Sequence, residues 1–135
     1  MFITLHSPIS LYADDNKLKG LIAYCNSAVA RYYLDFLAPT LNIMVGSVLA
    51  LPYKPEITSR DDINALVDEI MAISKDDWDS FECSWGSKRH PLLRGKSTIR
   101  EAYKEWEDEC NSRYLKLKTA EEKINQILID IYGLN

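Results

Sequence analysis

The chain has 135 residues, of which 47% are hydrophobic and 27% are charged, and its formal net charge at pH 7 is −4. This apolar content is enough for one compact domain with a real core, which excludes an intrinsically disordered chain. The negative charge also excludes attraction to nucleic acid by overall charge, so any DNA contact must come from a local patch or from parts of a larger protein.

The three cysteines predict a reducing compartment. Cys25, Cys83 and Cys110 are odd in number and lack the spacing of metal ligands. Together with the lack of an apolar signal segment, they predict free thiols and a cytoplasmic protein. No apolar stretch reaches the roughly 18 residues that a bilayer span requires, so no membrane partner is predicted.

The first residues of the chain have strand-like character. Phe2–Leu5 and Ile9–Tyr12 are short aliphatic and aromatic runs on either side of Pro8. They predict two short strands or one bent strand. His6 has no partner at metal-ligand spacing, so we interpret it as a turn or packing residue.

A strongly patterned helical segment follows. Its apolar residues recur at steps of three and four, which is typical of one broad helical face. We predict one helix from about Asn16 to about Leu37. Asp14 or Asp15 would cap its N-terminus, and Pro39 cannot continue it.

The apolar stretch after Pro39 predicts a compact corner that packs against this helix. We predict that Leu41–Val45 is extended and that Gly46, which tolerates a positive φ, turns the chain. Ser47 would then cap a single helical turn that ends at Pro52.

A second amphipathic helix is predicted after Ser59, which forms a weak capping box with Asp62. Its apolar pattern continues to Ile73, and a new helical segment is expected from Ser74.

In that new segment three aromatic residues, Trp78, Phe81 and Trp85, would lie on one face. The rings are either core residues or a platform on which bases stack. Because the neighbouring aspartates would repel phosphates, we favour the core.

The only local basic patch lies in the loop that follows. Two interpretations are open: the cations contact DNA phosphates, or they are solvated and pair with acids before the loop or in the next helix. These candidate DNA-binding residues are Lys88, Arg89, Arg94, Lys96 and Arg100.

The last region predicts a long helix that begins after Ser97 or Thr98 and reaches Tyr132. Its apolar residues alternate mostly at steps of four and three, as in a coiled coil or a helical hairpin. No Gly or Pro interrupts it near Thr119, so we predict at most a local kink, and Gly133 is the expected stop.

Three separated blocks in one order resemble a known family. The first is NSAVARYYLDFLAPTLNIMVGSVLALPY (26–53), the second is WDSFECSW with the following HPLL, and the third is EEKINQILIDIYGL (121–134). From about Leu18 to Leu134 the chain is similar to the C-terminal target-recognition and helical part of adenine-specific DNA methyltransferases. These are enzymes of the PglX type, from BREX phage-defence systems, and related single-chain restriction-modification enzymes.

The resemblance implies that a larger parent protein acts on DNA with S-adenosylmethionine as its cofactor. It also implies the methyltransferase core and other defence-system proteins as partners. The chain itself lacks the Asn/Asp-Pro-Pro-Tyr/Phe loop and the glycine-rich cofactor turn that such chemistry needs. Glu107, Asp108 and Glu109 are consecutive and point in different directions around a helix, so no metal site is predicted.

We therefore predict a mainly α-helical module with a long C-terminal helix or helical hairpin and a small N-terminal β element. Residues 1–57 would end a target-recognition-like region, and residues 58–135 would form a helical region of the same compact unit. The predicted function is non-catalytic DNA recognition or scaffolding, with no catalytic, cofactor-binding or metal-binding residue in this chain. The alternative is a self-contained helical interaction module that forms a coiled coil or homodimer through the last helix.

Overall fold

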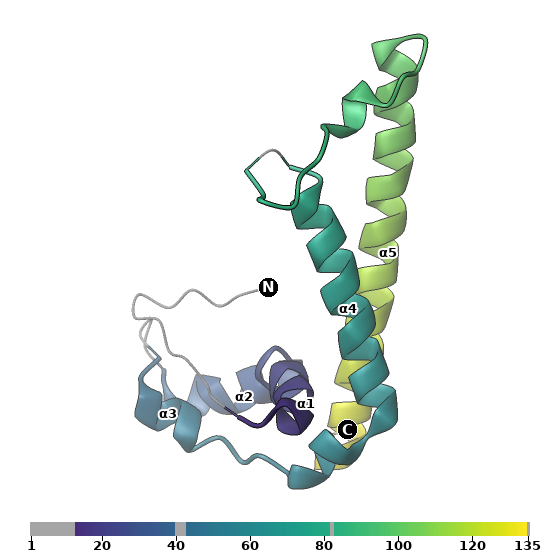
Figure 1. Cartoon of the computed structure of the whole chain (residues 1–135). Coiled ribbons are helices and arrows are strands. Elements are labelled where there is room, and N and C mark those ends of the chain that lie inside the picture. The colour runs from purple at the N-terminus through teal and green to yellow at the C-terminus, as the bar shows by residue number, and fades with distance from the viewer. Residues whose placement is uncertain (1–12, 40–42, 82, 135) are drawn as a thin grey trace. The chain divides into compact units, whose positions relative to one another are not determined.

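The computed structural model describes residues 13–39, 43–81 and 83–134 (Figure 1). These residues contain no strand, so the mainly α-helical fold class is confirmed for them, whereas the predicted strands Phe2–Leu5 and Ile9–Tyr12 lie outside them. Five α-helices and two 3-10 helices follow one another as α1 (Asp15–Cys25), α2 (Ala28–Leu37), α3 (Val45–Leu49), η1 (Pro55–Ser59), α4 (Asp61–Asp79), η2 (Pro91–Leu93) and α5 (Ile99–Tyr132).

The chain divides into two compact units. Unit 1 comprises residues 1–67 and 122–135, and unit 2 comprises residues 68–121. Because α4 and α5 each pass from one unit into the other, both units contain parts of these two helices. The predicted functional division after residue 57 stays a prediction.

Among the described helices, none combines the length and apolar character that a bilayer crossing requires.

The single helix predicted from Asn16 to Leu37 is wrong, because the structure has two helices, α1 and α2, in this stretch. The side chain of Asn26 donates to the carbonyl of Ile22 at 2.9 Å. Ser27 donates to Tyr24 O at 2.6 Å and accepts from Ala30 N at 3.2 Å as the N-cap of α2. These side chains satisfy the backbone groups that a helix break leaves free, so no Gly or Pro is needed.

The predicted turn at Gly46 is also wrong. Gly46 and Ser47 both lie inside α3, which begins after the N-cap Met44. Among the described residues, positive φ occurs only at Gly95 and Gly133. A single helical turn was predicted in this region, but the predicted cap at Ser47 is wrong, because α3 begins at Val45 with Met44 as its N-cap and ends at Leu49. Of the predicted extended stretch Leu41–Val45, the first two residues lie outside the described ones.

Unit 1 has a buried core centred on Tyr24, which is 1% exposed. Its ring stacks on Tyr132 with the ring centres 5.7 Å apart and meets Tyr53 edge-on at 5.4 Å. The hydroxyls of Tyr24 and Tyr132 both donate to the carbonyl of Pro52. The largest other fully buried side chains of this core are Val29, Ile57, Ile63, Val67 and Leu128.

The long final helix is confirmed. α5 runs for 34 residues without a break. Thr98 accepts from Glu101 N at 3.2 Å at its start, and Gly133 ends it with a φ of 65°. Lys54 Nζ donates to the carbonyl of Ile131 at 2.6 Å, which satisfies one of the carbonyls that the end of a helix leaves free.

Unit 2 has little buried apolar surface, and the core interpretation of its aromatic residues is wrong. Trp78 is 61% exposed, Phe81 44% and Trp85 105%. The reason is that α4 continues through Ser74 to Asp79, so Phe81 and Trp85 lie beyond its end and share no helical face with Trp78. The buried residues described in this unit are Ser84, Pro91, Ala102 and Ala120.

The two glycines of the helical N-terminal region predict opposite responses to the same substitution. A Cβ on the buried Gly20 would lie 2.9 Å from the backbone Cα of Thr58, whereas a Cβ on Gly46 would meet nothing within 4 Å. Gly20→Ala should therefore lower the free energy of unfolding by about 1–2 kcal/mol, because the close approach of α1 to η1 is lost. Gly46→Ala should raise it by about 0.5–1 kcal/mol through helix propensity. Urea unfolding followed by circular dichroism measures both, and equal signs would contradict the described packing.

The tyrosine core also predicts a loss of stability in alkali. Burial raises the pKa values of Tyr24, Tyr53 and Tyr132 above their ordinary value. The unfolded chain therefore loses these protons first, near pH 10. The free energy of unfolding is highest below that pH and falls as the pH rises further. The fall is up to about 1.4 kcal/mol per pH unit for each tyrosine. Tyr24→Phe should make this fall less steep in urea unfolding measured from about pH 8 to about pH 11. An unchanged slope would show that Tyr24 ionises in the folded protein as it does in the unfolded chain.

Candidate nucleic-acid interface

The structure separates the five predicted DNA-binding residues into two groups, all within unit 2. Arg94 and Lys96 form ion pairs with the first half of α5: Arg94 pairs with Glu109, and Lys96 Nζ lies 3.1 Å from Glu105 Oε2. The Arg94 guanidinium lowers the pKa of the Glu109 carboxyl. For these two cations the structure favours the second interpretation, pairing with the acids of the next helix.

Lys88, Arg89 and Arg100 form the second group, which we call the unpaired cations. All three are exposed, and none makes an ion pair with any residue that the structure describes. Lys88 and Arg89 precede η2, and Arg100 lies in the first turn of α5. Three positive charges are therefore available to an anion that approaches this end of unit 2.

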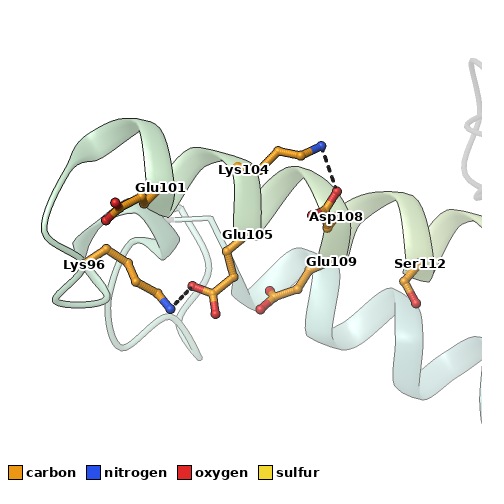
Figure 2. Close-up of a pocket in the computed structure, with 7 residues that line it drawn as sticks. All are labelled: Lys96, Glu101, Lys104, Glu105, Asp108, Glu109 and Ser112. Atoms are coloured by element: carbon orange, nitrogen blue, oxygen red, sulfur yellow. Dashed lines mark ion pairs between the residues drawn. The ribbon is translucent and has the colours of Figure 1, made fainter.

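A hollow on the surface of α5 lies next to the paired cations (Figure 2). Figure 2 shows two ion pairs among the residues that line it, from Lys96 to Glu105 and from Lys104 to Asp108. Its acids outnumber its cations, so it would repel a phosphate backbone. The residues that line it are Lys96, Glu101, Lys104, Glu105, Asp108, Glu109 and Ser112. Among the described side chains, no group of three or more His, Cys, Asp or Glu is placed to hold a metal ion.

The loop after α4 is held by a turn that the sequence did not predict. Ser84, 7% exposed, donates from its hydroxyl to Asp79, which also pairs with Lys75. The backbone N–H of Gly86 donates to Ser84 Oγ at 3.1 Å. Lys75 and then Ser84 lower the pKa of Asp79. We call the residues Asp79, Ser84 and Gly86 the Ser84 turn.

Of the other chemistry-bearing side chains of unit 2, His90 has structural partners. His90 Nδ1 accepts from Leu92 N at 3.2 Å and caps η2. The imidazole meets the ring of Trp106 edge-on, with the centres 5.5 Å apart. Cys83 and Cys110 are free thiols, as is Cys25 in unit 1.

Two known proteins are similar to nearly the whole chain. It is 32% identical over 133 residues to the adenine-specific methyltransferase PglX of Lacticaseibacillus casei (strain Zhang), covering 93% of this chain and 11% of that protein. It is 28% identical over 120 residues to the adenine-specific methyltransferase BrxX of Escherichia coli O9:H4 (strain HS), covering 89% of this chain and 10% of that protein. No family model matches the chain. No solved structure matches it.

These similarities confirm the resemblance to PglX-type methyltransferases that the three sequence blocks indicate. The chain spans only about a tenth of the length of these relatives, so it corresponds to one segment of them.

Proposed function

We propose that this chain, which corresponds to a segment of a PglX-like adenine-specific methyltransferase, is a non-catalytic module that helps to hold DNA and to position the rest of that enzyme. The observation that carries the proposal is the similarity to PglX over 93% of the chain. In this proposal the parent enzyme acts in phage defence or restriction-modification in the cytoplasm. The remainder of the parent binds S-adenosylmethionine and the target adenine.

The absence of the motifs for methyl transfer from the sequence supports a non-catalytic role. An adenine methyltransferase needs a pocket for a flipped base and a glycine-rich turn for its cofactor. The five prolines of the chain never occur as a pair, and its five glycines are scattered. Methyl transfer to DNA by the isolated chain in the presence of S-adenosylmethionine would overturn this part of the proposal.

The unpaired cations support a DNA contact. Lys88, Arg89 and Arg100 are exposed on one loop region and the helix start that follows it. Phosphate contacts of this kind need no base-specific geometry and position a protein on the duplex. Such contacts suit a module that orients DNA for chemistry that occurs elsewhere.

Exposed apolar side chains support the scaffolding part of the role. In unit 1, Phe36 is 70% exposed, Met44 71% and Leu49 75%. Large apolar side chains gathered on a surface mark interaction sites in soluble proteins. The methyltransferase core of the parent, and other defence-system proteins, are the partners that we propose for them.

The division of the cations gives a matched test of DNA binding. Each phosphate contact contributes about −0.9 to the slope of log affinity against log salt, so a triple variant Lys88→Gln, Arg89→Gln and Arg100→Gln should flatten that slope by about 3. The control variant Arg94→Gln and Lys96→Gln removes two positive charges. It should leave the slope nearly unchanged, because these residues pair with Glu109 and Glu105. Fluorescence anisotropy of a labelled DNA duplex across a salt series measures both. A wild-type slope near zero, or equal effects of the two variants, would contradict the DNA contact.

A specific observation favours the alternative of a self-contained interaction module. Ile99 is 76% exposed, Tyr103 52% and Tyr114 62%. Their separations of four and eleven residues place them on one face of α5, because four residues make slightly more than one turn and eleven residues slightly more than three. An exposed apolar stripe on a long helix is the feature that coiled-coil partners cover.

Light scattering distinguishes the two functions. If the stripe pairs two copies, the mass should rise with concentration toward twice the 15.5 kDa of the chain, and Tyr103→Glu with Tyr114→Glu should return it to the monomer value. Our proposed function predicts the monomer mass at every concentration. A dimer that the double substitution does not dissociate would exclude α5 as the contact.

A further inference from the structure

We propose that Trp85 is a stacking residue for an unstacked base of DNA, a role that deepens the proposed function and rests on it. Trp85 is 105% exposed, so its whole indole ring faces water. Tryptophan has one of the largest apolar surfaces among the side chains, and leaving it in water forgoes the stabilisation that burial would give. A ring presented in this way suits a flat ligand that covers it.

The Ser84 turn holds the backbone on both sides of Trp85. Ser84 is buried and its hydroxyl donates to Asp79, and the backbone N–H of Gly86 donates to Ser84 Oγ at 3.1 Å. A Cβ on Gly86 would lie 2.5 Å from an Asp79 carboxylate oxygen, so the chain passes Asp79 closely and a side chain there would disturb the turn. Ser84, which precedes Trp85, is thus buried while the indole ring is exposed, and hydrogen bonds before and after Trp85 fix the backbone that carries it.

The charges around the turn favour nucleic acid over an apolar protein surface. Two of the acids at the end of α4 are paired, Asp79 with Lys75 and Asp77 with Arg113 at 3.5 Å, which reduces their repulsion of phosphates. Lys88 and Arg89, two of the unpaired cations, follow Trp85 by three and four residues, within about 11 and 14 Å of it even if the chain is fully extended. Their long side chains therefore reach the phosphates next to a base that lies on the indole.

The ligand class follows from this combination of one ring and nearby cations. Every base has a flat π-face, so stacking on Trp85 would tolerate any sequence, and the cations would hold the backbone. A paired, stacked base offers no free face, so the ligand is a single strand or a base that has left the duplex stack. The same side chain can act as a wedge where a duplex is opened.

Binding to oligothymidylate tests the inference. Trp85→Ala should weaken the binding of fluorescein-labelled oligothymidylate to the whole chain by about 5- to 150-fold, whereas Trp85→Phe should retain part of the affinity. The matched control is Trp78→Ala, which removes another exposed indole from the acidic end of α4 and should change the affinity by less than about twofold. Circular dichroism should show unchanged helix content in all three variants, because neither ring is buried.

The outcomes separate this inference from the proposed function. If Trp85→Ala binds as the wild type does while Lys88→Gln, Arg89→Gln and Arg100→Gln weaken binding, stacking is overturned and the DNA contact stands. If the wild-type chain binds neither oligothymidylate nor duplex, both are overturned. If Trp85→Ala leaves oligothymidylate binding intact but weakens association with the methyltransferase core of the parent, the ring docks on protein and stacking is overturned.

Discussion

The attachment of the last turn of α5 to the N-terminal part of the chain is the constraint on which unit 1 depends. Tyr132 stacks on the buried Tyr24, and both hydroxyls donate to the same carbonyl, that of Pro52. Lys54 reaches the carbonyl of Ile131, and its ammonium lies 4.9 Å from the centre of the Tyr132 ring. Because the end of a helix leaves carbonyls without partners, these contacts stop α5 and complete the core in one place. The segments joined here are separated by more than 75 residues, so these core contacts are long-range ones that need the end of α5.

Unit 2 is organised by a different physical principle. Its described buried residues are few, and many of its large apolar side chains, Trp78 and Trp85 among them, are exposed. Its segments are joined by the ring contact of His90 with Trp106 and by ion pairs between partly exposed side chains, such as Arg94 with Glu109 and Arg113 with Asp77. Pairs of this kind contribute at most about 1 kcal/mol each, so they specify geometry more than they stabilise it.

The same ion pairs determine which cations of the loop remain unpaired. Arg94 and Lys96 serve to hold the loop to α5, which leaves Lys88, Arg89 and Arg100 as the cations that an anion would meet. A net charge of −4 for the chain does not oppose this, because charges further away than about 10 Å are largely screened at physiological salt. In the proposed function, local pairing therefore governs DNA binding more than composition does. In the parent enzyme such a patch would act together with the contacts that the rest of the protein makes.

The sequence by itself determined the features that depend on neighbours along the chain. It predicted the mainly helical class and the unbroken α5, because no Gly or Pro lies within that helix and Gly133 follows it. It also contained the resemblance to PglX-type enzymes. Only the tertiary structure decided where α1 ends. The break at Ser27 relies on side-chain hydrogen bonds, whereas the apolar pattern of the sequence continues through it. Tertiary structure likewise decided that Trp78 and Trp85 are exposed and which cations are paired, because periodicity gives the face of a helix but not whether anything covers it.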